Sequence, residues 1–250
     1  MTLDPLRRVR YELRSFLGSR PGLFLPLARL ERTLRPDPHR LAPRPLTDRT
    51  ELVLEGYPRS ANTFAAAAFL SAQPGHVEVA HHLHAPAQVI AAVRRGLPAL
   101  VLIREPVAAI VSLIIFAPFL TPVQALRSYR RFHRAVLPHR DRFVTADFRE
   151  VITDFGAVID RLNAEMGTRF ARFDHHDESV ARCFAEIEER NRRLFGGKLS
   201  EAWIARPSDV RGDDAARLRS VVEAPRLAPL LEECRRLYGQ LTPLGHGAAR

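Results

Sequence analysis

Residues 51–64 read Glu-Leu-Val-Leu-Glu-Gly-Tyr-Pro-Arg-Ser-Ala-Asn-Thr-Phe, and this stretch decides the fold class. Residues 51–57 predict a strand, residues 58–62 a turn, and the alanine-rich residues 63–71 a helix. The pattern returns downstream, where the continuous apolar run 99–103 predicts a buried strand and Pro106 suits the first turn of the next helix. Strands alternating with helices predict a parallel sheet with helices on both faces.

The rest of the chain divides into an N-terminal extension, a main domain and a tail. A basic helical extension with a proline-rich connector is expected over residues 1–46, the main domain over 47–240, and a flexible tail over 241–250. Within these limits the apolar periodicity predicts one further strand at 142–145. It also predicts helices at 3–17, 86–95, 122–137, 147–166, 177–195, 213–223 and 226–239.

Composition excludes several classes of protein. With 46% hydrophobic and 26% charged residues over 250 positions, the chain is not disordered, collagenous or a disulfide scaffold. Its two cysteines favour a reducing compartment, and we expect a cytoplasmic protein. The uncharged run between Glu105 and Arg127 is long enough to cross a bilayer, but Pro118 and Pro122 interrupt it, so we interpret it as a helix buried in an α/β core.

The charge balance points to an anionic ligand or partner. The net charge is +10, and Lys198 is the only lysine among the cations. Arginine presents a planar fork that suits phosphate or sulfate oxygens, although the balance alone does not separate nucleotide, nucleic acid and anionic lipid. The helix at 3–17 carries an apolar stripe that either packs on the main domain or rests on an anionic membrane, and packing is the favoured prediction.

The turn after the first strand has the composition of an anion cradle. A helix that starts after a short loop directs free backbone N–H groups and its positive dipole end at one point. Ser60, Asn62 and Thr63 add side-chain donors, and Arg59 adds a full charge. The Gly-x-x-x-x-Gly-Lys-Ser/Thr pattern of nucleotide triphosphatases is absent, which argues against use of ATP with Mg²⁺.

Two further groups of residues are expected near this cradle. Arg104 ends the second predicted strand, and Ser112 follows eight residues later, so both could reach a ligand across the strand ends. Between the two turns stands His81-His82-Leu83-His84. A histidine there can act as general base, and in an extended segment His82 and His84 would share a face while His81 points away. No second ligand cluster accompanies these histidines, so we expect no metal.

Together these motifs resemble the sulfotransferases that use 3′-phosphoadenosine 5′-phosphosulfate (PAPS), and we take the chain as a bacterial-type member. The resemblance implies that the loop from Pro58 to Thr63 grips the 5′-phosphosulfate, that Arg104 and Ser112 hold the 3′-phosphate, and that Phe64 stacks on the adenine. His82, followed by Leu83, resembles the family's catalytic base, with His84 and then Glu78 as substitutes. The implied site is therefore Arg59, Ser60, Ala61, Asn62, Thr63, Phe64, His82, His84, Arg104 and Ser112.

Some positions depart from the family pattern. Arg59 stands in place of lysine, and Ala61 stands in place of a glycine, which is unfavourable if that position needs a positive φ. The family's C-terminal phosphate-binding segment has no clear match, and its candidates are residues 196–198, Arg206 and Arg211.

The resemblance implies a P-loop NTPase-like three-layer α/β/α fold with a mostly parallel sheet and a helical C-terminal part. It implies sulfuryl transfer from PAPS, without a metal, to a hydroxyl of a carbohydrate, lipid or small natural product. Nucleic acid is not an expected partner, and peripheral contact with an anionic membrane is the minority view. Two alternatives stay open: an ATP-dependent phosphotransferase, and a non-catalytic basic protein that binds nucleic acid or membrane.

Overall fold

A four-stranded parallel sheet forms the centre of the molecule. The computed structural model describes residues 4–194, 196 and 212–242. The strands lie in the order β2-β1-β3-β4, and each pair is parallel. Their bounds are β1 Leu52–Gly56, β2 Val79–His81, β3 Ala99–Ile103 and β4 Val144–Asp147.

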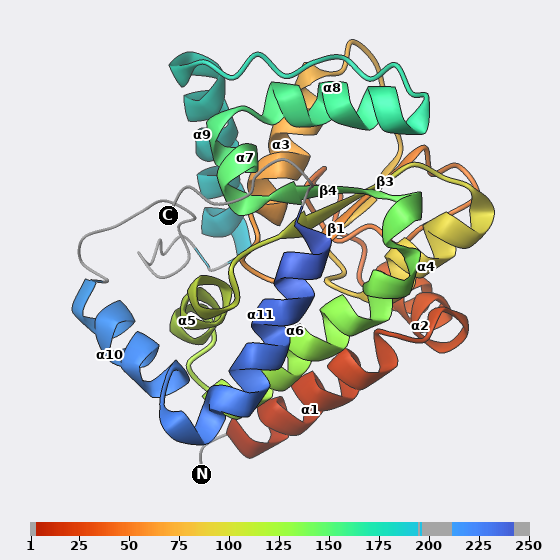
Figure 1. The fold of residues 1–250 in the computed structure, drawn as a ribbon. Coiled ribbons are helices and arrows are strands. Elements are labelled where there is room, and N and C mark those ends of the chain that lie inside the picture. The colour runs from red at the N-terminus through yellow and green to blue at the C-terminus, as the bar shows by residue number, and fades with distance from the viewer. Residues whose placement is uncertain (1–3, 195, 197–211, 243–250) are drawn as a thin grey trace.

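Helices cover both faces of this sheet and make three layers (Figure 1). One face carries α4 (Pro86–Arg95), α5 (Pro106–Phe116), α6 (Pro122–Val136), α10 (Gly212–Val222) and α11 (Ala228–Leu241). The other carries α3 (Asn62–Ala72), α7 (Phe148–Thr153), α8 (Phe155–Met166) and α9 (Asp177–Leu194). Short 3₁₀ turns, η1 (Leu137–Arg142) and η3 (Pro225–Leu227), precede β4 and α11. The expected three-layer α/β/α class with a helical C-terminal part is confirmed.

The apolar runs in the sequence fit this arrangement because strands covered on both faces have no solvent side. Val101 and Ile103 of β3 pack into one helix layer, while Leu100 and Leu102 pack into the other. The first part of the uncharged run after Glu105 becomes α5, most of whose side chains are buried in the first layer, and its end begins α6. No helix in the described part of the chain has both the length and the apolar character needed to cross a bilayer.

Three segments differ from the expectation. The predicted helix 147–166 is two helices, because Asp154 ends α7 and its side chain caps α8 by accepting from the Ala157 amide at 3.0 Å. The chain also forms β2 and a helix α2 (Pro21–Leu34), which the sequence did not predict. Residues 243–250 of the expected tail lie outside the described residues.

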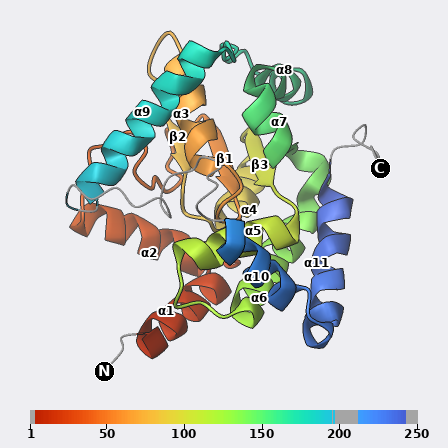
Figure 2. The same cartoon turned by 90° about the vertical axis from the view of Figure 1, so that its left-hand side faces the viewer.

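The N-terminal helices sit at the edge of the molecule (Figure 2). Helix α1 (Asp4–Leu17) lies along α6, and α2 packs on α4. The contact face of α1 differs from the prediction, because its apolar stripe is exposed and none of its residues is buried. The helix is held instead by polar side chains such as Tyr11, whose hydroxyl lies 2.7 Å from the Ser128 hydroxyl of α6.

Candidate functional site

The strand order creates a crevice at the carboxyl ends of β1 and β3. From β1 the chain turns to β2 on one side, and it then crosses back to β3 on the other side. The register pairs Gly56 with Leu102, so both strands end at the same edge. Open α/β sheets bind ligands at such a reversal of strand order. The two turns singled out in the sequence, after Gly56 and after Ile103, both lie there.

The first turn is a tight loop held by its own backbone. The Asn62 side-chain amide donates to the Tyr57 carbonyl at 3.0 Å, and the Ser60 N–H donates to the same oxygen at 3.3 Å. Arg59 and Ala61 have φ values of 71° and 65°, in the left-handed region. Ala61 therefore occupies a position that glycine would fill without strain, which confirms that the departure from glycine is unfavourable.

The two helices that start at the crevice differ in how their first amides are satisfied. The carboxylate of Glu105 caps α5 and accepts from the Val107 and Ala108 amides at 3.0 and 2.7 Å. Helix α3 begins after Ala61, which has no side chain able to cap it. The first-turn amides of α3 are therefore the ones available to an anionic ligand.

The two predicted motifs touch each other. The Arg59 side chain donates from Nε to the Ser112 hydroxyl at 3.0 Å, and its guanidinium lies 5.1 Å from the centre of the Phe116 ring. Arg104 donates from Nη1 to the Arg59 carbonyl at 2.8 Å, and its guanidinium stacks 3.9 Å from the ring centre of Phe148. Ser112 was expected to act with Arg104, but its hydroxyl pairs with Arg59.

Two residues of the loop differ from their expected roles. Phe64 is 3% exposed and packs among Phe173, His175 and Phe184, with ring centres 5.5–6.2 Å apart, so the prediction that it stacks on an adenine is wrong. Asn62 was expected to donate to the anion, and one of the two hydrogens of its amide nitrogen is used by the Tyr57 carbonyl. Both side chains support the loop from behind.

Ser60 and Thr63 remain as hydroxyl donors. The Ser60 side chain is fully buried, and its Oγ has no hydrogen-bond partner in the structure. A buried polar atom without a partner is uncommon and suggests a missing ligand or water. Thr63 donates to the His82 ring, as described next.

The rings of His81 and His82 are hydrogen-bonded to each other, and the His84 ring lies 5.9 Å from that of His82, centre to centre. His81 Nε2 lies 3.1 Å from the Arg40 carbonyl, so it must donate, which leaves His81 Nδ1 as an acceptor for His82 Nδ1 at 2.6 Å. His82 Nε2 then carries a lone pair and accepts from the Thr63 hydroxyl at 3.1 Å. The expectation that His81 faces away from His82 is wrong, because both rings meet.

The histidines are neutral at physiological pH. Burial is the main cause of the lowered pKa at each ring: about 3 for His81, about 4 for His84, and well below 6.5 for His82. Positive charges add to this effect, and Arg190 of α9 contributes at all three rings. A neutral imidazole is the protonation state that a general base needs before it accepts a proton.

Arg190 belongs to the site although the sequence did not indicate it. Its side chain is partly buried, its Nε has no hydrogen-bond partner, and burial lowers its pKa. Arg14 and Arg59 also act on His84, so arginines from three separate elements surround the histidines. This surrounding charge favours an anionic ligand.

Glu55 fixes the histidine segment to β1. Its carboxylate is fully buried and accepts from the amides of Leu83 at 2.7 Å and His84 at 2.9 Å, and from the Gln88 side chain at 2.9 Å. His84 Nδ1 also donates to the Gly56 carbonyl at 3.0 Å. Burial raises the pKa of Glu55 to about 8, against the effect of these donors. The sequence signal that could have revealed the role of Glu55 is an acidic residue inside an otherwise apolar strand.

The loop and the histidine segment share one backbone property. His82 and His84 have φ values of 62° and 52°. With Arg59 and Ala61 they are the non-glycine residues of positive φ in the described part of the chain. Such strain costs about 1–3 kcal/mol per residue and persists where surrounding contacts enforce it, which is common at functional sites.

A cavity of about 220 Å³ lies beside the histidines, under the N-terminal helices. His82, His84 and the Tyr57-Pro58 turn form one wall. Further lining residues are Tyr11, Arg14, Ser15, Phe24, Ser128 and Phe132. Because α1 and α2 supply much of this lining, the sequence motifs alone did not predict the cavity.

The remaining candidates do not join the site. Glu78 precedes β2, at the opposite edge of the sheet from the crevice, and its carboxylate pairs with His76 at 3.0 Å. Gly196 lies outside the described helices, and residues 197, 198, 206 and 211 fall outside the described part of the chain. The described residues contain no cluster of three or more side chains able to hold a metal ion.

No family model matches the chain, and no curated protein matches it. Among solved structures, the chain is similar to mouse sulfotransferase SULT7A1, in a structure described as complexed with PAP. The two share 13% sequence identity at a TM-score of 0.40, over 74% of this chain and 90% of the mouse chain. The bacterial-type assignment stays a prediction.

Proposed function

We propose that this chain is a sulfotransferase that moves a sulfuryl group from PAPS to a hydroxyl group of an acceptor. One observation carries the proposal: the two turns with sulfotransferase-like motifs meet, with Arg59 Nε 3.0 Å from Ser112 Oγ and Arg104 bonded to the Arg59 carbonyl. A neutral histidine, His82, borders the same loop through Thr63. The side chain of Thr63 therefore connects the anion-binding loop to the base.

The residues at the crevice fit a phosphosulfate. The uncapped first turn of α3 offers backbone donors, Ser60 offers a buried hydroxyl without a partner, and Arg59 offers charge. PAPS, as the substrate, supplies a sulfuryl group already bonded to a phosphate oxygen. Arg104, bonded to the Arg59 carbonyl, and Arg190, which acts on all three histidines, are the proposed cations for a second anionic group of the same molecule.

The reaction requires one proton acceptor and one leaving group. The acceptor hydroxyl takes the position of the Thr63 hydroxyl at His82 Nε2, and its oxygen attacks sulfur. A new oxygen–sulfur bond forms, and the bond from sulfur to the bridging oxygen breaks. Its electron pair stays on the 5′-phosphate of adenosine 3′,5′-bisphosphate, where Arg59 and the α3 amides stabilise the charge. The proton goes to His82.

The cavity beside His82 supports a small and largely apolar acceptor. Phe24, Leu83 and Phe132 line it, while the Tyr11 and Ser128 hydroxyls supply polar contacts. Its volume of about 220 Å³ is below the roughly 300–1,000 Å³ of ordinary ligand pockets. The acceptor is therefore a small hydroxylated molecule, or the hydroxyl-bearing end of a larger one.

Calorimetric titration of the purified chain tests the donor. Adenosine 3′,5′-bisphosphate should bind, and Arg104→Ala should weaken it about ten- to hundredfold, the scale of one charge-assisted hydrogen bond. Arg236→Ala, at an exposed position of α11, is the matched control and should change nothing. Tighter binding of ATP with Mg²⁺ would favour a phosphotransferase, and binding of DNA alone would favour a non-catalytic basic protein.

A turnover assay then separates binding from chemistry. With PAPS and a panel of small alcohols and phenols, Arg59→Ala should reduce turnover by at least about a hundredfold, the scale for loss of a key charge-stabilising donor. Bisphosphate binding should fall less than turnover. Near-normal turnover in a folded Arg59→Ala variant would remove this loop from the mechanism.

A further inference from the structure

The two N-terminal helices expose most of the large apolar side chains found at the surface. Eight of the eleven exposed ones among the described residues lie on α1 and α2, each roughly half or more exposed. On each helix they recur at three- and four-residue spacing, which places them on one face. We call these residues the outer stripe: Leu6, Val9, Leu13, Phe16, Leu23, Leu27, Leu30 and Leu34.

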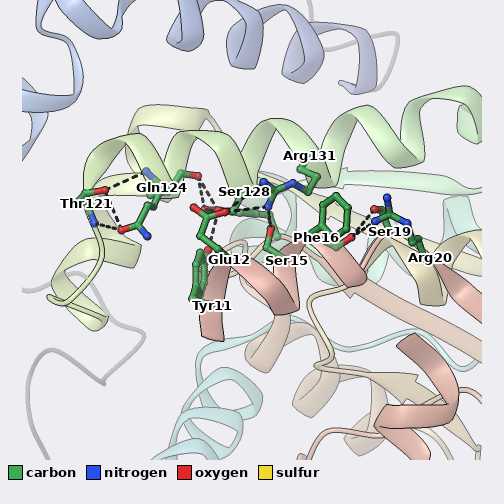
Figure 3. Close-up of polar contacts among 12 residues, drawn as sticks. Tyr11, Glu12, Ser15, Phe16, Ser19, Arg20, Thr121, Gln124, Ser128 and Arg131 are labelled. Atoms are coloured by element: carbon green, nitrogen blue, oxygen red, sulfur yellow. Dashed lines mark hydrogen bonds and ion pairs between the residues drawn. The ribbon is translucent and has the colours of Figure 1, made fainter. Parts of the chain in front are cut away.

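The outer stripe is not the face that holds these helices on the domain. Figure 3 shows α1 meeting α6 through polar side chains: Tyr11 bonds to Ser128, and Arg131 donates to Ser15 at 2.6 Å. Helix α2 buries a different set, Phe24, Leu25 and Ala28. The faces of α1 and α2 that turn toward the domain are therefore already occupied by these contacts, and the outer stripe is exposed to solvent. Monomeric soluble proteins rarely expose large apolar patches without a binding role.

Arginines accompany the outer stripe. Residues 1–35 contain eight arginines and three acidic residues, a balance of +5. Two of the acids are paired, Glu12 with Arg131 and Glu31 with Arg14. Arg7 and Arg10 are exposed on α1, and the Arg20 guanidinium lies 3.8 Å from the ring centre of Phe16 in the stripe. Exposed cations therefore lie on the same helix as the apolar stripe of α1, and Arg20 contacts the stripe directly.

We propose that the outer stripe docks on the surface of an anionic lipid bilayer. Its leucines and Phe16 would enter the boundary between headgroups and acyl chains, and the arginines would contact lipid phosphates, as interfacial amphipathic helices do. A second copy of the chain is the competing occupant. The core of a protein interface is depleted of charge, whereas this surface is rich in unpaired cations, so the lipid surface fits better.

Vesicle sedimentation of the full chain tests this proposal without any assay of turnover. The chain should sediment with vesicles of equal parts phosphatidylcholine and phosphatidylserine, and much less with phosphatidylcholine alone. Leu13→Gln combined with Leu27→Gln should weaken binding about a hundredfold, from the lost burial of two leucines. Ile152→Gln, at an exposed position of α7, is the matched control and should have no effect.

The electrostatic part is tested separately. Arg7→Glu combined with Arg10→Glu should weaken binding to the mixed vesicles at least about thirtyfold, since each basic residue near an anionic surface contributes about 1 kcal/mol. Arg236→Glu is the control. Equal binding to both vesicles, or binding indifferent to the leucine variants, would overturn the proposal. So would a dimer that Leu13→Gln and Leu27→Gln convert to a monomer, without vesicle binding in the parent chain.

Discussion

Acid should unfold this protein through its buried neutral histidines, and His133 isolates the effect. His133 lies on α6, away from the arginines of the candidate site, and is fully buried. Its ring stacks on Tyr129 with centres 3.9 Å apart, Nδ1 donates to the Tyr129 carbonyl at 2.8 Å, and Nε2 has no partner. Burial lowers its pKa from 6.5 to about 4.

The sign follows from which state binds the proton first. As the pH falls below 6.5, the unfolded chain protonates His133 while the folded chain does not, so the free energy of unfolding falls. The loss is complete only below pH 4, where the folded state is protonated as well. Between about pH 7.5 and about pH 5 this single residue should remove about 2 kcal/mol, against a total stability of about 5–15 kcal/mol.

His133→Phe is the perturbation, because phenylalanine keeps the ring and removes the titration. The stability of variant and parent is measured by urea unfolding at both pH values. At the higher pH the two should be nearly equally stable. At the lower pH the variant should be more stable by about 2 kcal/mol. His76→Phe, at an exposed loop position, is the control and should behave like the parent. A parallel fall in stability for His133→Phe and the parent would refute the reasoning.

Three further predictions concern the candidate site. Ala61→Gly should leave the melting temperature unchanged or raise it, because the positive φ of Ala61 costs alanine about 1 kcal/mol. The control Ala68→Gly, inside α3, should lower the melting temperature. Equal losses in the two variants would mean that no strain is stored at Ala61. His82→Ala should reduce turnover by about 10²–10⁴ and spare bisphosphate binding, with His84→Ala costing less; the reverse order would assign the base to His84. Glu55→Gln places an amide NH₂ group opposite the Leu83 and His84 backbone donors. It should lower turnover about tenfold or more and shift the pH dependence of turnover. An unchanged pH dependence would leave Glu55 only a structural role.

Local signals in the sequence predicted much of the fold. The helix at 86–95 and the strand at 99–103 match the structure, because a proline at the first turn and a continuous apolar run are unambiguous. Strand β2 was missed because three residues are too few for a period. Helix α2 was missed because Pro21, Gly22 and Pro26 argue against a helix, and packing of Phe24 on the residues of α4 outweighs them.

Site residues that follow directly after the parallel strands could be predicted from the sequence. Residues whose position depends on contacts with distant segments of the chain could not. Arg59 and Arg104 follow parallel strands, so their meeting at one edge follows from the fold class. The burial of Phe64 depends on α9, more than a hundred residues away, and no local pattern reports it. The same holds for Arg190, whose effect on the histidines arises only once α9 packs on α3.

The last two residues of β1 connect the two chemical parts of the site. Glu55 and Gly56 hold the histidine segment, and the loop that follows them holds the anion cradle, so one short stretch of backbone sets the spacing between the two. Much of the remaining cavity wall comes from α1 and α2, which precede that stretch in the chain, and from α6. The reacting groups and much of the cavity wall therefore come from different parts of the chain. Grafting a different pair of N-terminal helices is a direct way to change which molecules enter the cavity while the reacting groups keep their distances.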